Sequence, residues 1–325
     1  MIQRQLQCGF FSLALSLMLG IAQAQTQTYP TKPVMLVVPQ AAAGTNDIVA
    51  RLIAPALGEA LNGSVVVENR PGAGGNIGTQ AVTKSAKDGY TLLLTINSAQ
   101  AINPALYKNP GFDPVGDFTF LYYIGATPYV LVSPPGSPLK TLADVVAAAK
   151  KKPGELAYAS AGNGTISHLL GAMLATSAGI ELQHIPYKGV APAINDVLGG
   201  QIPLAFASLP SALTYIKAGK LQPIAISSAK RSPAAPDVPT LAETYPDCVG
   251  EVWAGLFAPT GVNPEIMKTL QAAMAKVMAR PDVRERLTLQ GLDLTPVTTN
   301  KLAGFLNDEI TKWARIVKAS GARLD

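Results

Sequence analysis

The sequence predicts an α/β protein, because short apolar segments alternate with amphipathic segments of helical period along most of the chain. Residues 34–38 are apolar on both faces, which is typical of a parallel strand covered by helices. A helix over residues 47–61, in which Pro55 should cause a kink, and a strand over 64–68 follow. The N-terminal region therefore begins with the strand–helix–strand order of this fold class.

Residues 1–24 have the features of a secretion signal. Arg4 supplies a positive charge, residues 10–21 form an apolar run too short to span a bilayer, and Ala22-Gln23-Ala24 is a small-x-small cleavage site. We expect an exported chain that begins near Gln25. Cys248 is then the only cysteine, which excludes an internal disulfide and a thiolate metal cluster.

The composition also excludes several classes of partner. The chain has 325 residues and a formal net charge of +5, and its one basic run, Lys150–Lys152, falls at a predicted helix end. No basic cluster is interleaved with aromatic residues, so no nucleic-acid partner is expected. With only His168 and His184, a histidine-rich metal site is excluded as well. We expect neither a metal nor a cofactor.

Two loops share one design, in which a strand passes through small residues into a helix. The first is Ala41–Gly44, where Thr45, Asn46 or Asp47 can cap the following helix; the second is Ala161–Gly164, followed by a helix that Thr165 would cap. The first N–H groups of a helix have no internal partner and carry the positive end of its dipole. The sequence therefore predicts two anion-binding loops, one in each half of the chain.

The glycine-rich run Asn69–Gly78 resembles a dinucleotide fingerprint but fails it, because Ile77 stands where the third glycine should be. We interpret the run as a structural turn. A strand over residues 91–95 places Asn97 and Ser98 at a carboxyl edge, where ligands of parallel sheets bind.

Later elements complete the pattern. Thr141 with Asp144 predicts a capped helix, and Asn263-Pro264 predicts the start of another. Further strands are expected over 129–133, 156–160, 180–185, 204–208, 221–227 and 253–257, and a last helix over 300–319.

Several motifs in this order resemble the extracytoplasmic solute receptors of tripartite tricarboxylate transporters, the Bug family. The matching segments are residues 44–51, 68–78, 88–91, 161–169, 186–189, 198–201 and 236–240. The resemblance implies a type II periplasmic-binding-protein fold with two α/β lobes, residues 25–126 with 228–325 and residues 127–227, joined near 125–128 and 227–229. It also implies a periplasmic monomer that delivers a small organic carboxylate to membrane components of a tripartite tricarboxylate-type transporter.

The resemblance and the two loops together give a candidate ligand site. Its residues are Gln40, Ala43, Gly44, Thr45, Asn46, Asp47, Asn97, Ser98, Ser160, Gly162, Gly164, Thr165, His168, Tyr187, Ala207 and Ser208. Asp47 is expected to cap its helix more than to touch the ligand, and Lys188 to be a solvated or structural cation.

Two departures from the family pattern bear on the ligand. This chain has Ala43-Gly44 where the family usually has two glycines, and Ala207-Ser208 where many members carry an acidic residue. The missing acid predicts a ligand without an amine, namely a dicarboxylate, either an aliphatic C4 to C6 diacid or an aromatic diacid such as terephthalate.

The alternative function is an exported α/β hydrolase. Ser167 and His168 are adjacent in sequence, but adjacent residues of a helix do not face each other and no G-x-S-x-G elbow is present. The effector-binding half of a transcription regulator shares the fold but lacks a signal peptide. We therefore expect a binding protein and no enzyme.

Overall fold

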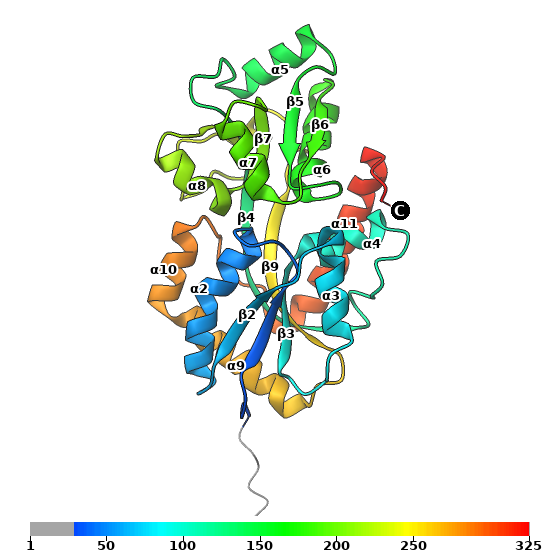
Figure 1. Cartoon of the computed structure of the whole chain (residues 1–325), viewed down its shortest axis with the longest axis vertical. Coiled ribbons are helices and arrows are strands. Elements are labelled where there is room, and N and C mark those ends of the chain that lie inside the picture. Colours follow the sequence, from blue (N-terminus) through cyan, green and yellow to red (C-terminus); the bar gives the residue numbers. More distant parts are fainter. Residues whose placement is uncertain (1–28, 325) are drawn as a thin grey trace, which may run out of the picture.

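The computed structural model describes residues 29–324, so the predicted secretion signal lies outside the described residues. Two α/β lobes stand one above the other along the long axis of the molecule (Figure 1). One nine-stranded sheet runs through both lobes in the order β2-β1-β3-β9-β4-β7-β5-β6, and β8 pairs with β4. The α/β class predicted from the sequence and the two-lobed type II architecture are confirmed.

The strands of the lower lobe in Figure 1 are β1, β2, β3 and β9, and those of the upper lobe are β5 to β8, with β4 shared. Their bounds are β1 Val34–Val38, β2 Val65–Asn69, β3 Thr91–Ile96, β4 Phe118–Ser133, β5 Ala157–Ser160, β6 Gln183–Pro186, β7 Leu204–Ser208, β8 Gln222–Ile226 and β9 Glu251–Pro259.

The helices cover the two faces of each part of the sheet. Their bounds are α2 Thr45–Ala60, α3 Asn76–Thr83, α4 Asn103–Leu106, α5 Leu142–Lys151, α6 Ile166–Ala178, α7 Val190–Leu198, α8 Leu209–Lys217, α9 Pro264–Ala279, α10 Pro281–Leu289 and α11 Leu302–Ser320. Short 3-10 turns lie at Ala73–Gly75, Leu241–Glu243 and Thr299–Lys301, and a π-helical turn at Ser98–Ile102. Helix α2 runs on through Pro55 as one element.

Strand β4 connects the lobes and is much longer than the sequence predicted. Its first part pairs with β9 from Phe118 to Pro128, and its last part pairs with β7 and β8 from Tyr129 onward. The prediction of a strand over 129–133 found only the upper part. Bulges near Phe120 and Gly125 break the alternation of side chains in the lower part, which removes the sequence signal for a strand.

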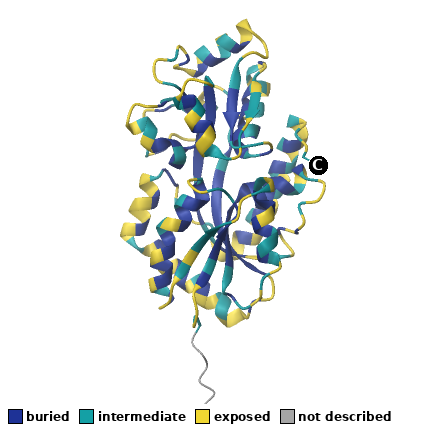
Figure 2. Ribbon diagram, viewed as in Figure 1, coloured by how far each residue is buried: buried dark blue, intermediate teal, exposed yellow. Residues whose placement is uncertain are grey.

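The core follows the sheet. A large cluster of buried side chains, which includes Leu36, Leu93, Phe257 and Trp313, extends from the lower lobe to Phe206 of the upper lobe, and a second cluster lies between β7, β8, α7 and α8 (Figure 2). Ala235 and Val238, from the proline-rich segment 232–239, belong to this second cluster. We keep the predicted lobe boundaries as a proposal.

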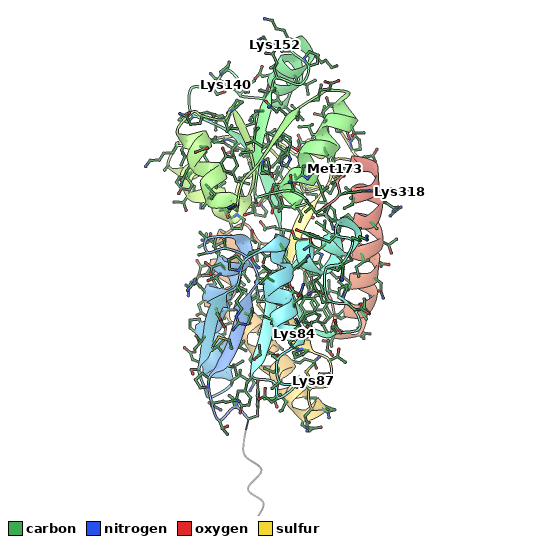
Figure 3. All side chains as sticks on the ribbon, turned by 45° about the vertical axis from the view of Figure 1, so that its right-hand side comes forward. Lys84, Lys87, Lys140, Lys152, Met173 and Lys318 are labelled. Carbon is green, nitrogen blue, oxygen red and sulfur yellow. The ribbon has the colours of Figure 1, made fainter. Side chains whose placement is uncertain are left out.

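Charged residues are dispersed over the outer surface. The labelled Lys140 and Lys152 lie on the upper lobe, Lys84 and Lys87 near the base of the lower lobe, and Lys318 on α11 (Figure 3). Within residues 29–324, no helix is both long and apolar enough to cross a bilayer.

Candidate ligand cleft

A cavity of about 680 Å³ lies between the lobes. Its volume is within the range of 300–1,000 Å³ that is common for small-molecule sites. Its walls come from the loops that follow the strands of both lobes, the edge at which ligands of α/β sheets bind. The predicted residues among its walls are Gln40, Gly44, Thr45, Asn46, Ser98, Gly162, Thr165, Tyr187 and Ser208.

Five helices present their N-terminal ends to this cavity. The N-cap residues of α2, α3, α6, α7 and α8 are Gly44, Gly75, Thr165, Gly189 and Ser208, and all of them line it. None of these helices has a side chain that caps its first N–H groups. At α2, α6, α7 and α8 the first N–H groups and the positive dipole ends are therefore available to an anion in the cavity. At α3 only the dipole end is available, because the Asn76 and Ile77 N–H groups donate to carbonyls of the preceding turn.

Two helices that begin away from the cavity, α5 and α9, are capped as the sequence predicted. Thr141 and Asp144 form a capping box at α5, and Asn263 Oδ1 accepts from the Glu265 N–H at α9, at 2.8 Å. The prediction that Thr45, Asn46 or Asp47 caps α2 is wrong at the N-cap itself, because Gly44 occupies that position. Thr165 does occupy the N-cap of α6, but its hydroxyl donates to the Gly162 carbonyl at 2.7 Å and leaves the helix N–H groups uncapped.

Asp47 holds the first loop in place from behind. Its carboxylate accepts from the Ala43 N–H at 2.9 Å, from Arg51 Nε at 2.9 Å and from Asn69 Nδ2 at 3.0 Å. Burial opposes ionisation, but these hydrogen bonds outweigh it and hold the pKa of Asp47 below its usual range. Ala43 has φ of 64°, the left-handed conformation that glycine adopts without strain. Asp47 therefore organises the loop and does not line the cavity.

The second loop is held in the same way by side chains behind it. Ser167 Oγ accepts from the Ala161 N–H at 3.0 Å, and His168 Nδ1 accepts from the Gly164 N–H at 3.0 Å. Ser160 Oγ accepts from the Gly162 N–H at 3.1 Å. These three hydrogen bonds fix the backbone of the loop, so Ser160 and His168 support the cavity without bordering it.

The two histidines stack against each other behind this loop. The His168 and His184 rings are 4.0 Å apart between centroids, and His184 Nε2 is 2.6 Å from Ser160 Oγ. Burial lowers the pKa of His168, and burial together with the neighbouring His168 lowers the pKa of His184 to about 4. Both rings are therefore neutral at pH 7, which His168 Nδ1 must be to accept a hydrogen bond.

Strand β6 leads into a turn that contributes Tyr187 and Lys188 to the cavity wall. The Tyr187 hydroxyl donates to Asp196 Oδ2 at 2.5 Å, and burial together with this hydrogen bond raises the pKa of Tyr187 to about 12. Among the cavity walls that the structure describes, Lys188 is the one charged residue. Lys188 is exposed, which agrees with the prediction of a solvated cation, and it also borders the cavity.

The glycine-rich run is more than a structural turn. Residues 71–75 line the cavity, and Gly72, Gly74 and Gly75 have positive φ angles. Tyr107, Tyr129 and Leu324 also line the cavity although the sequence did not indicate them, and Asn163 lines it from within the predicted second loop. Tyr107 and Leu324 carried no recognisable sequence signal, because they follow no glycine loop or strand edge that the sequence predicted.

Several predicted site residues lie beside the cavity but not among its walls. These are Ala43, Asp47, Asn97, Ser160, Gly164, His168 and Ala207. The Asn97 side chain donates to the Glu251 carbonyl at 2.9 Å, which links β3 to β9. Ala207 is fully buried in the second core cluster, so the neighbouring Ser208 faces the cavity instead. Ala207 therefore does not select against an amine in the cavity.

The serine and histidine of the hydrolase alternative are occupied elsewhere. Ser167 bonds to Ala161 and Thr165, and His168 bonds to Gly164. The hydrogen-bonded serine–histidine pair is Ser160 with His184, and Ser160 is fully buried. Neither serine combines a histidine partner with a place on the cavity wall.

Comparison with known proteins agrees with this geometry. The sequence model of the protein family described as the tripartite tricarboxylate transporter family receptor matches residues 49–322. Protein BugT of Bordetella pertussis is 38% identical over 305 residues, which cover 93% of this chain and 94% of BugT.

Two similar solved structures extend the comparison to the fold. The periplasmic binding protein BugD has a TM-score of 0.85 and 34% identity, covering 91% of this chain and 99% of BugD. An R. palustris protein solved with adipate has a TM-score of 0.87 and 33% identity, covering 91% of this chain and all of that one. A third, MatC from Rhodopseudomonas palustris, was solved with malate and has a TM-score of 0.82 and 30% identity, with 89% of this chain and 100% of MatC covered.

These relatives are solute-binding receptors, which confirms the resemblance and the expectation of a binding protein over a hydrolase. The chain belongs to the family of tripartite tricarboxylate transporter receptors.

Proposed function

We propose that this receptor captures a small amine-free dicarboxylate in the cavity between its lobes. The observation that carries the proposal is the set of helix N-termini with free N–H groups, from α2, α6, α7 and α8, that meet at one cavity. A charge-assisted hydrogen bond is worth about 1.5–3 kcal/mol, and micromolar binding needs about 8 kcal/mol in total after the costs of association. Several such bonds to two carboxylates suffice.

The charge of the cavity favours a ligand without an ammonium group. Among the described residues of its walls, Lys188 supplies a positive charge and no carboxylate faces it. An ammonium placed there would lose hydration and find no anion in return.

The two lobes supply separate sets of anion-binding groups. Helices α2 and α3 belong to the lower lobe, and α6, α7 and α8 to the upper one (Figure 1). One carboxylate at each set would hold the lobes together, as the hydrogen bond from Ser211 Oγ to the Ala43 carbonyl, 3.1 Å, also does. The related proteins solved with adipate and malate bind diacids, which supports this class. Both aliphatic C4 to C6 diacids and an aromatic diacid such as terephthalate remain candidates.

A matched panel of ligands tests the proposal. Thermal shift and calorimetric titration should detect succinate, adipate or terephthalate, because a ligand at 100 times its Kd stabilises a protein by about 2.7 kcal/mol. Aspartate and glutamate differ from aliphatic diacids by an ammonium group and serve as controls. Tighter binding of aspartate than of succinate, with no response to any amine-free diacid, would refute the proposal. NMR of the recovered ligand should show it unchanged.

We also propose that the chain works as a periplasmic monomer, cleaved near Ala24, and delivers its ligand to membrane components of a tripartite tricarboxylate-type transporter. Family membership supports this placement. Mass spectrometry of the periplasmic fraction should find a mature chain that begins near Gln25, and deletion of the receptor should abolish uptake of the labelled diacid. If the deletion strain still takes up the diacid, this chain is not the receptor that the transporter requires.

A further inference from the structure

We propose that the C-terminal segment Gly321–Leu324 forms one wall of the ligand cavity, and that Leu324 favours diacids with a long apolar body over short ones. The inference rests on the proposed function and adds a residue that determines specificity. Leu324 lies beyond residues 49–322, which match the family model, yet it borders the cavity.

The backbone fixes this segment against the lower lobe. Helix α11 ends at Ser320, and Gly321, with φ of 68°, turns the chain back. The Leu324 N–H donates to the Leu106 carbonyl at 2.9 Å, and Leu324 forms a parallel β-bridge with Tyr107. Ala322 and Leu324 also pack against the main core cluster. The side chain of Leu324 is therefore held in place at the cavity.

Leu106 and Tyr107, which bond to Leu324 through the backbone, contact the two predicted anion-binding regions. The Tyr107 hydroxyl approaches Gly74 so closely that a Cβ at Gly74 would lie 3.1 Å from it. The Leu106 side chain lies against Gly164 of the upper loop and leaves no room for a Cβ there. Leu324 and Tyr107 thus border the cavity next to the glycine-rich loop, and Leu106, which precedes Tyr107, contacts the loop before α6.

The chemistry of this wall differs from that of the helix ends. Leu324 offers only apolar contact, and it borders the cavity together with the rings of Tyr107 and Tyr129. The carboxylates of a ligand would be held by helix N–H groups, so its carbon body is the part that meets this wall. Each further methylene or ring carbon that a ligand buries there strengthens binding. A short diacid gains less from the wall than a long or aromatic one.

Calorimetric titration of succinate, adipate and terephthalate against Leu324→Ala tests the inference. We expect the affinity for adipate or terephthalate to fall about four- to fifteenfold, since the lost contact equals one or two buried methylenes, while the affinity for succinate changes less than twofold. Leu324→Met keeps the apolar volume and should restore the preference. Arg323→Ala, an exposed neighbour in the same segment, should bind like the natural chain.

The ratio of the affinities for long and short diacids distinguishes a Leu324 that contacts the ligand from one that has only a structural role. If Leu324→Ala weakens all three diacids equally, or leaves the ratio unchanged, the inference is overturned although the proposed function stands. A natural chain that binds only succinate also overturns it. A natural chain that binds none of the three diacids refutes the proposed function, and the inference falls with it.

Discussion

Adding one methyl group at Gly164 should lower both the ligand affinity and the folding stability, by two different mechanisms that can be measured separately. It belongs to the upper loop, has φ of 73°, and lies against Leu106 of the lower lobe. In Gly164→Ala, the new Cβ would overlap Leu106 Cδ2. The substitution therefore introduces backbone strain within one lobe and a steric conflict between the two lobes.

The two effects have different magnitudes and different consequences. A non-glycine residue in the left-handed region costs about 1–2 kcal/mol, which lowers the free energy of unfolding whether or not the lobes are together. Moving Leu106 away from its preferred rotamer costs about 0.5–1.5 kcal/mol, and this cost applies only where the lobes meet. We therefore expect ligand affinity to fall roughly tenfold at the upper end of this range, since a tenfold change corresponds to about 1.4 kcal/mol.

Gly179→Ala is the matched control. Gly179 ends the same helix, α6, with φ of 59°, and a Cβ there would meet nothing within 4 Å. This variant should lose a similar free energy of unfolding and bind the ligand normally. Thermal unfolding and calorimetric titration of both variants measure the two quantities separately.

Leu106→Ala in the Gly164→Ala background tests the source of the affinity loss. Removing the isobutyl group makes room for the new methyl, so part of the affinity should return although the backbone strain remains. If the double variant binds no better than additive single effects predict, the contact between Leu106 and Gly164 does not limit ligand binding. Equal affinity of the natural chain and Gly164→Ala would refute the reasoning at its first step.

Three further predictions concern charge, protonation and backbone strain. Lys188→Met should weaken diacid binding several-fold at low salt and less at high salt, because screening already reduces the attraction of an exposed cation; titration at two salt concentrations measures this. In the natural chain, the depressed pKa of His184 means that stability is full above about pH 6.5 and is lost as pH falls toward 4, whereas His184→Gln should flatten this dependence of the melting temperature. Ala43→Gly should raise the free energy of unfolding in urea by up to about 1 kcal/mol, because glycine relieves the positive φ at a smaller cost in unfolded-state entropy.

Each of these predictions has a control on the same chain. Lys220→Met removes an exposed lysine that does not line the cavity, and it should leave affinity unchanged. Ala42→Gly changes a residue without positive φ in the same loop, so it should only destabilise. A melting temperature of His184→Gln that falls with pH as steeply as in the natural chain would assign the acid sensitivity to other groups.

The sequence alone determined the α/β class and the family, and it located two loops that we predict to bind anions. Apolar strands, helix periods and small-residue loops are local patterns, and they survive as segments such as β1 and α2 in the structure. Capping at Thr141 and Asn263 was equally local and was predicted correctly. The lower part of β4 was not predicted, because bulges there interrupt the alternation of side chains that identifies a strand.

Only the tertiary structure decided which residues face the cavity. It brings the ends of α3, α7 and α8 to those of α2 and α6, and it places Leu324 beside Tyr107. The pairing of β7 with β4 also sets the register, so that Ala207 packs in the core and Ser208 faces the cavity. These relations join residues far apart in the chain, and they depend on how the sheet orders its strands, which no local segment specifies.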